Sequence, residues 1–189
     1  VEWLRFRKKA SLRKHQEDQI KETAKQWLDA RLFVEDILGK PGSEFTLPDA
    51  AITSVEEAES VASAVRQQWD IGSWPIESIS SAMERSGVYV VEIESDAAVD
   101  GISGVADERI PFVVVSTTAP ADRMRMNLAH ELGHIVIRPT KDEKYDERVA
   151  FRFAAALLIP AEVMSDKFGQ KRNRVDLREF VLVKQEYGI

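Results

Sequence analysis

Residues 127–136 read NLAHELGHIV, and positions 130–134 of this stretch form the pattern HELGH. The apolar residues Leu128, Leu132 and Ile135 recur around it at i, i+4 and i+7, and Pro139 follows them. This spacing is typical of an amphipathic helix, which a proline cannot continue. We therefore predict a helix from about residue 120 to about residue 137.

The two histidines of this pattern, His130 and His134, are separated by one helical turn. Residues four apart project from one face of a helix with side chains about 6 Å apart, and two imidazoles so placed can share a tetrahedral zinc ion. The competing interpretation is an accidental pair of core or surface histidines. The chain has only three histidines, so chance rarely gives this order with a glutamate between, and we favour metal binding. The third, His15, is interpreted as a solvated side chain.

Glu131 follows His130 directly, which rotates it about 100° around the helix axis and places it beside the metal position. A bound zinc ion lowers the pKa of its water toward ~7. A carboxylate in that place can take the water's proton during attack on a carbonyl and later pass it to the leaving amine. We therefore predict Glu131 as a catalytic general base.

A catalytic zinc site needs a third protein ligand, and no further histidine lies near the pattern. A carboxylate must supply it, and the candidates downstream are Asp142, Glu143, Asp146 and Glu147. Glu147 shares a helical stripe with Ala150 and Ala154, and small residues let two helices approach closely. Gly133 fits the same close approach, because a glycine inside a helix costs about 1 kcal/mol. The residues alone leave open whether Glu147 is a ligand or a solvated residue near a helix start.

The composition is that of an ordinary globular protein, with 44% hydrophobic and 31% charged residues. The absence of cysteine excludes disulfides, a thiolate metal site and a cysteine nucleophile. No apolar run approaches the ~18 residues of a membrane span, and the start of the chain is charged where a signal peptide is apolar. We therefore expect a soluble cytoplasmic protein. The net charge of −6 argues against nucleic-acid binding by the chain as a whole.

The beginning of the chain differs from the remainder. Residues 5–14 hold six basic side chains and no acidic one, and apolar residues then recur at helical spacing from about residue 16 to about residue 38. Residues 40–49, KPGSEFTLPD, have the composition of a linker. We predict residues 1–42 as a helical connector with a basic start and residues 43–189 as a second domain.

Three runs rich in β-branched residues follow two helical segments in the second domain, at residues 88–93, 99–106 and 110–116. We predict that they form a small antiparallel sheet with tight connections. The HELGH helix, a helix ending at Pro160 and two shorter helices complete the chain. The predicted fold class is α+β, with the small antiparallel sheet packed on the HELGH helix and the surrounding helices.

The motifs of this chain resemble those of the ImmA/IrrE family of bacterial metallopeptidases. The family pattern is a strand, an arginine shortly before HELGH, and then E-x-x-A-x-x-F-A-x-x-L-L-x-P. Here it reads IPFVVVS at 110–116, Arg123, HELGH, and ERVAFRFAAALLIP at 147–160. The second motif makes the resemblance specific, because HExxH alone occurs in many unrelated peptidases. The likeness is strongest over residues 55–160.

This resemblance implies a zincin-like metallopeptidase domain with His130, His134 and Glu147 as zinc ligands and Glu131 as general base. Several members cleave a helix-turn-helix repressor and so switch on stress-response or mobile-element genes, which implies a repressor as the protein substrate. Many relatives carry an Xre-type helix-turn-helix domain upstream. The chain is therefore interpreted as a fragment of a larger regulator that meets DNA only through a missing domain.

A His₂Glu site also takes manganese or cobalt, so the native metal is not settled by the motif. No oxyanion-stabilising residue is assigned, and the polar groups near the motif are interpreted as structural: Arg123, Arg138 and Tyr145.

We thus expect a zinc-dependent endopeptidase that relieves transcriptional repression. The alternative is a transcriptional regulator or partner-binding module whose metal domain senses or binds without turnover. A purely structural zinc is disfavoured, because structural sites usually close all four positions with protein ligands and only three are in view.

Overall fold

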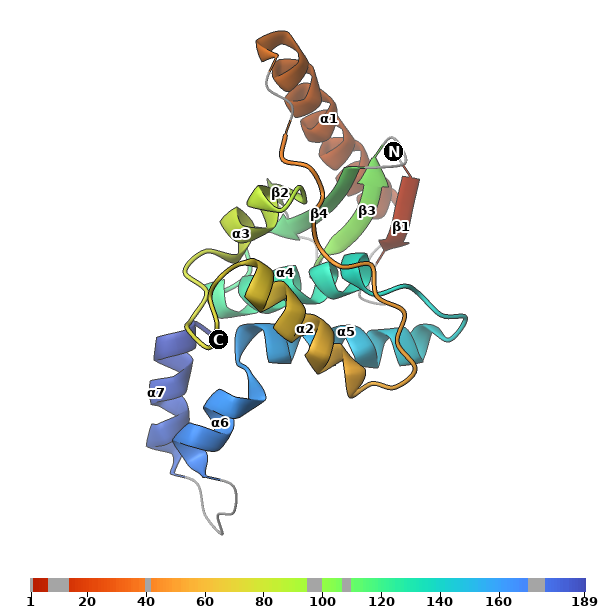
Figure 1. The fold of residues 1–189 in the computed structure, drawn as a ribbon. Helices are drawn as coiled ribbons and strands as arrows, with labels where there is room; N and C mark the ends of the chain where they lie inside the picture. Colours follow the sequence, from red (N-terminus) through yellow and green to blue (C-terminus); the bar gives the residue numbers. More distant parts are fainter. Residues whose placement is uncertain (1, 7–13, 40–41, 95–99, 107–109, 170–175) are drawn as a thin grey trace. The chain divides into compact units, whose positions relative to one another are not determined.

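The structure, a computed structural model, describes residues 2–6, 14–39, 42–94, 100–106, 110–169 and 176–189. Most of the basic run at the start of the chain lies outside these ranges. Seven helices and four strands form within them, which confirms the predicted α+β class (Figure 1). The chain divides into two compact units, each built from two stretches: residues 1–46 with 80–120, and residues 47–79 with 121–189.

A four-stranded sheet with the strand order β1-β3-β4-β2 forms the centre of the first unit. β3 pairs antiparallel with both β1 and β4, whereas β2 pairs parallel with β4. The sheet is therefore mixed, and the prediction of a wholly antiparallel sheet is wrong. The strands are β1 (Glu2–Phe6), β2 (Tyr89–Ile93), β3 (Ile102–Ala106) and β4 (Ile110–Ser116).

The lengths of the connections explain the mixed sheet. Only residues 107–109 join β3 to β4, and so short a connection suits antiparallel neighbours. Residues 94–101 join β2 to β3, which is enough chain for β3 to pair away from β2. β4 then lies between the two and runs in the direction of β2.

Helix α1 (Lys14–Leu38) confirms the helix predicted from about residue 16 and packs on this sheet. Its residues Ile20, Ala24 and Leu28 recur at i, i+4 and i+8. They are buried against Tyr89, Val91, Ile93, Ile102, Ala106, Phe112 and Val114. Residues 2–6, predicted as the basic start of a helical connector, instead form strand β1. The domain boundary after residue 42 stays a prediction.

A short helix, α3 (Ile79–Arg85), leads into β2 through Gly87. This glycine has a φ of 81°, in the left-handed region. A Cβ atom there would lie 2.5 Å from the backbone of Glu44, so the turn leaves no room for a side chain.

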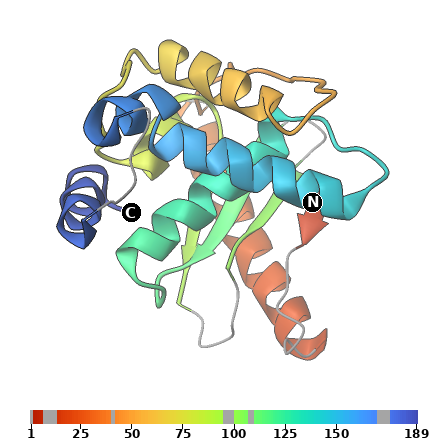
Figure 2. The same cartoon turned by 90° about the horizontal axis from the view of Figure 1, so that it is seen from below.

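The described residues of the second unit form five helices: α2 (Glu57–Gln68), α4 (Ala121–Val136), α5 (Glu143–Leu158), α6 (Ala161–Phe168) and α7 (Leu177–Tyr187). α5 packs on both α2 and α4 and lies between them in Figure 2. α6 and α7 share a smaller apolar cluster: Val163, Phe168, Val183 and Tyr187. The helices predicted around HELGH and before Pro160, and the two in the tail, are confirmed.

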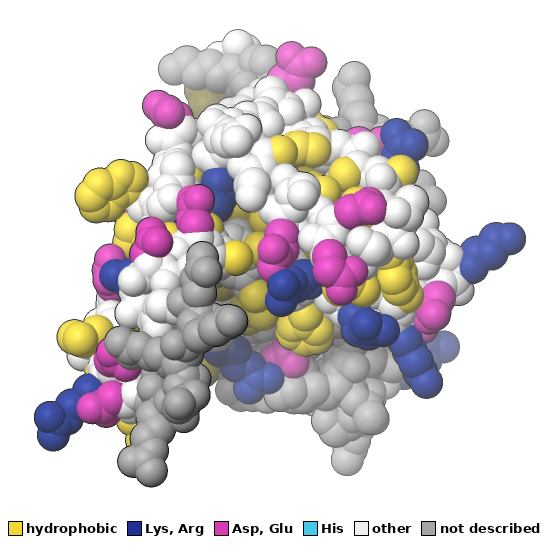
Figure 3. Space-filling model, turned by 60° about the horizontal axis from the view of Figure 1, so that its bottom comes forward, with side chains coloured by type: hydrophobic (Ala, Val, Ile, Leu, Met, Phe, Trp, Pro, Cys, Tyr) yellow, Lys and Arg dark blue, Asp and Glu magenta, His cyan; other side chains and the backbone are white. Residues whose placement is uncertain are grey.

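The sheet and the HELGH helix belong to different units, so their predicted packing on one another stays a prediction. On the face drawn in Figure 3, acidic, basic and hydrophobic side chains are interspersed. No helix in the described ranges combines the length and the apolar character needed to cross a membrane.

Candidate metal centre

Helix α4 carries both histidines of the HELGH pattern, and backbone hydrogen bonds secure its end just after them. Ala50 N donates to Val136 O, and Arg138 N donates to Ala50 O, each at 2.8 Å. These bonds form a parallel bridge between Ala50 and Ile137 where the helix stops. His130 and His134 lie one turn apart just before this secured helix end. Both are buried, with exposed fractions of 2% and 8%.

Helix α5 begins at a well-defined point because two carboxylates secure its first turn. Asp142 accepts hydrogen bonds from the backbone N–H groups of Lys144 and Tyr145, at 3.0 and 3.2 Å. Asp146 is buried and accepts from the backbone N–H and the hydroxyl of Thr140. Of the four carboxylates considered as a third ligand, these two are thus used in the loop, and Glu143 is exposed. The structure brings Glu147 to the histidines.

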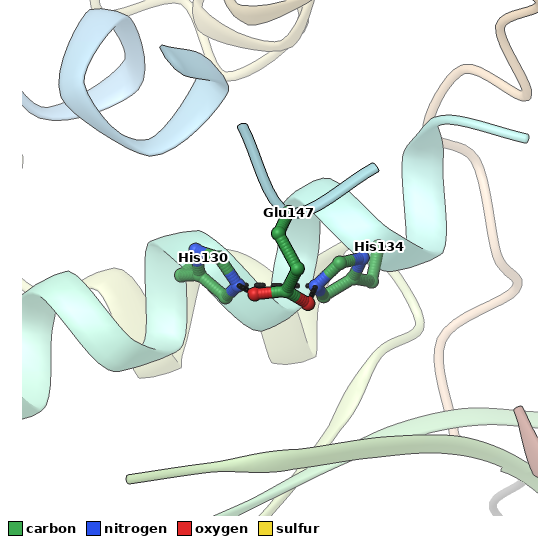
Figure 4. A group of neighbouring side chains, drawn as sticks. All are labelled: His130, His134 and Glu147. Carbon is green, nitrogen blue, oxygen red and sulfur yellow. Dashed lines mark hydrogen bonds and ion pairs between the residues drawn. The ribbon is translucent and has the colours of Figure 1, made fainter. Parts of the chain in front are cut away.

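The three side chains converge on one point (Figure 4). The Nε2 atoms of His130 and His134 lie 3.0 Å apart. Glu147 places Oε1 3.2 Å from Nε2 of His134 and Oε2 3.9 Å from Nε2 of His130. The two imidazole rings stand nearly perpendicular, at 76°, with centroids 4.8 Å apart. The carboxylate therefore faces both ring nitrogens at once.

This donor set fits a divalent metal ion. Ligand atoms that share a tetrahedral zinc ion lie about 2.0–2.2 Å from it, hence roughly 3.3–3.6 Å from one another. The separations of 3.0, 3.2 and 3.9 Å bracket that range. Among the described residues, no other three histidine or carboxylate side chains gather in this way. His130, His134 and Glu147 could hold a metal ion together.

Close packing of α4 on α5 brings the ligands within reach of one another. A Cβ atom on Gly133 would lie 3.2 Å from Cα of Ala150 and 3.0 Å from Cδ1 of Phe153. The glycine and the alanine thus meet where the two helices touch, one residue from His134 and three from Glu147. The packing reason predicted for the mid-helix glycine is present.

The sequence from residue 83 to residue 189 matches the model of the Peptidase M78 family, described as the IrrE N-terminal-like domain. The match spans more than half of the chain and includes both histidines and Glu147. The chain belongs to this family. The resemblance to ImmA/IrrE peptidases seen in the motifs is thereby confirmed. No curated protein sequence matches the chain.

Membership of the M78 peptidases supports proteolytic activity, and the His-His-Glu group could hold the metal of a metallopeptidase. Glu131 lies in the same turn of α4 and is 2% exposed. Its role as general base stays a prediction.

The sequence patterns did not indicate one residue beside this candidate metal centre. The ring of Phe151 lies against that of His130, with centroids 4.5 Å apart and a tilt of 57°. Phe151 is nevertheless 50% exposed. Its spacing of four residues from Glu147 was the available signal, because it places both on one face of α5.

The polar residues near the motif that were interpreted as structural lie outside the group of converging ligands: Arg123, Arg138 and Tyr145. Arg138 forms an ion pair with Asp49, with Nη2 2.8 Å from Oδ2, and this bond holds the pKa of Asp49 below its usual value. Arg123 is exposed in the first turn of α4, and the hydroxyl of Tyr145 is buried.

Proposed function

We propose that this M78 protein is a zinc-dependent endopeptidase that cleaves a DNA-binding repressor of the helix-turn-helix type. The observation that carries the proposal is the convergence of His130, His134 and Glu147, with three ligand atoms within 4.8 Å of one another. Three protein ligands leave a fourth coordination position for a reactant, which is typical of catalytic zinc sites and not of structural ones.

Each side chain of the site has its own role in the proposed reaction. A zinc ion held here would polarise the scissile carbonyl and acidify the attacking water. His130 and His134 supply neutral nitrogens, and Glu147 supplies one negative charge. Glu131 accepts the proton of the attacking water and delivers it to the nitrogen of the leaving amine. Its burial limits competition from solvent.

A repressor substrate is supported by two considerations. The resemblance to ImmA/IrrE peptidases implies this class, because several of them cleave helix-turn-helix repressors. The chain is also acidic, with a net charge of −6, whereas DNA-binding proteins carry basic surfaces. Opposite charge speeds the encounter of two proteins. Cleavage would release the genes that the repressor silences, as in a stress or mobile-element response.

The test uses zinc-loaded wild-type protein, a Glu131→Gln variant and a panel of purified helix-turn-helix repressors. Glu131→Gln keeps the shape of the side chain and removes the base, so zinc content should stay and cleavage should stop. Glu143→Gln, an exposed change about one helical turn before Glu147 on α5, serves as the matched control and should cleave normally.

Cleavage that survives in Glu131→Gln would overturn the assigned mechanism. A repressor that binds equally to wild type and Glu131→Gln, with no cleavage by either, would favour the regulator without turnover. Cleavage of unfolded proteins alone, with every repressor left intact, would support peptidase activity but reject helix-turn-helix repressors as its substrates.

A further inference from the structure

Phe151 is the aromatic residue that borders the metal centre from α5. It follows Glu147 by four residues, so both side chains emerge from the same face of the helix. Its ring contacts the ring of His130, one of the three converging ligands. An exposed apolar side chain is unremarkable by itself, since much of any protein surface is apolar. Its position against a metal ligand gives this one significance.

Exposure differs sharply among the residues around the metal position. The side chains of His130 and His134 are only 3% and 4% exposed, whereas that of Glu147 is 33% exposed and Phe151 as a residue is 50% exposed. The histidine side chains are thus almost closed to solvent, whereas the two α5 side chains at the centre are partly open to it. A chain that approaches the centre from this side meets Glu147 and Phe151.

We propose that Phe151 forms the wall of a specificity subsite that receives an apolar side chain next to the scissile bond of the substrate. This inference rests on the proposed peptidase function and adds the substrate class. The Phe151 ring lies 4.5 Å, centroid to centroid, from the ring of His130, so the subsite adjoins one of the side chains that would hold the metal. A leucine or phenylalanine on a residue flanking the scissile carbonyl reaches the ring, and both surfaces leave water.

The selectivity expected of such a wall is substantial but limited. Apolar pockets discriminate between side chains by about 10- to 200-fold in kcat/KM. The wall is a single aromatic ring that is half open to solvent, so the lower end of that range applies. Peptides with an acidic or hydroxyl side chain at this place gain no apolar contact and should be poorer substrates.

Phe151 could instead act only by holding the His130 ring in place, as a positioning residue. The two roles differ in what they change. A positioning role alters the zinc affinity, and restoring zinc restores the wild-type preference. A subsite role alters the preference among peptides while the protein is fully loaded with zinc.

The experiment compares a set of peptides that differ only in the residues on either side of the cleaved bond. Wild type, Phe151→Leu and Phe151→Ala are assayed at saturating zinc, and zinc affinity is measured by competition with a chromogenic chelator. Phe180→Ala is the matched control. Phe180 is 47% exposed and packs against another aromatic ring, Phe168, but lies on α7. Peptide binding to zinc-loaded Glu131→Gln, with and without Phe151→Ala, gives a readout that needs no turnover.

We expect wild type to prefer leucine or phenylalanine over aspartate or serine by about tenfold or more. Phe151→Leu should retain most of this preference, Phe151→Ala should abolish it, and Phe180→Ala should leave it unchanged. An unchanged preference in Phe151→Ala, or a loss of zinc affinity with wild-type preference once zinc is restored, would overturn the subsite.

The outcomes separate this inference from the proposed function. If wild type cleaves peptides but Phe151→Ala keeps their ranking, the subsite is wrong and the peptidase stands. If no peptide or protein is cleaved, yet Glu131→Gln binds apolar peptides more tightly in a way that depends on Phe151, the subsite stands and the peptidase is wrong. Absence of both cleavage and selective binding rejects both.

Discussion

Gly133 and Ala150 meet where α4 touches α5, so closely that a methyl group on the glycine would lie 3.2 Å from Cα of the alanine. Neither residue is a metal ligand. Their contact nevertheless sets the separation of the two helices, and this separation determines whether Glu147, on one helix, reaches His134, on the other. The geometry of the candidate metal centre thus depends on the small size of these two residues.

Substitution of Gly133 by alanine should weaken metal binding. The added methyl group would also lie 3.0 Å from the buried ring of Phe153, so α5 must shift. Overpacking costs about 1–3 kcal/mol, and the better helix propensity of alanine offsets about 1 kcal/mol of that. We expect a modest loss of stability in thermal unfolding and a clear loss of zinc affinity in competition titrations. Unchanged zinc affinity would show that the helix spacing does not govern the centre.

Metal content should depend on the converging ligands and on no other histidine. Protein purified without chelator should contain about one zinc per chain by mass spectrometry, as expected for a His₂Glu site. His134→Ala should lose this metal. His15→Ala, a change of the exposed histidine on α1, is the control and should retain it. Metal that survives in His134→Ala would place the ion elsewhere, and a different metal in wild type would correct the zinc assignment.

Replacement of Arg66 by leucine should strongly destabilise the second unit. Arg66 is 2% exposed and donates to the carbonyl of Gly72 at 2.7 Å, and to those of Trp74 and Leu157. Leucine would leave three carbonyls without this donor, which should lower the free energy of unfolding by about 3 kcal/mol.

A surface arginine provides the comparison for this stability test, which urea denaturation can measure. The Arg152 side chain is 50% exposed and pairs with Glu59. Arg152→Ala should cost less than about 1 kcal/mol, as is usual for exposed ion pairs. Equal effects of the two substitutions would contradict the structural role given to Arg66.

Tyr89 should ionise only at strongly alkaline pH. Burial, together with a 2.6 Å hydrogen bond to Glu35, raises the pKa of Tyr89 to about 12. The folded protein favours the neutral phenol, so this contribution to stability is complete below about pH 10 and is lost as the pH rises through about 12. In a spectrophotometric titration, Tyr89→Phe should remove a step near pH 12, whereas Tyr187→Phe should retain it. An unchanged step near pH 12 in Tyr89→Phe would contradict the assignment.

Local patterns predicted the helices and the group of His130, His134 and Glu147 that could hold a metal ion, because both depend on residues close in sequence. The spacing of Leu128 and Leu132 predicted α4, and the stripe that joins Glu147 to Ala150 predicted the face of α5 that meets it. Asp142 and Asp146 could not be excluded from sequence as ligands. Their use in holding the loop before α5 depends on the backbone path there.

The sheet was harder to predict, since strand pairing joins residues far apart in the chain. The β-branched runs located β2, β3 and β4, but nothing local shows that β4 inserts between the other two. β1 was missed because residues 2–6 adjoin a strongly basic segment that favoured a solvated connector. Phe151 was missed for a similar reason: its exposure and its contact with His130 arise only when two helices are packed.

The alternation of the two units along the chain has a consequence for how the protein can be divided. The polypeptide passes from one unit to the other three times, near residues 46, 79 and 120. No single cut therefore releases either unit as one continuous piece, and a truncation that starts at residue 83 removes α1 from one unit and α2 from the other. Gene fusion or limited proteolysis at any one of these junctions would therefore yield a partial unit.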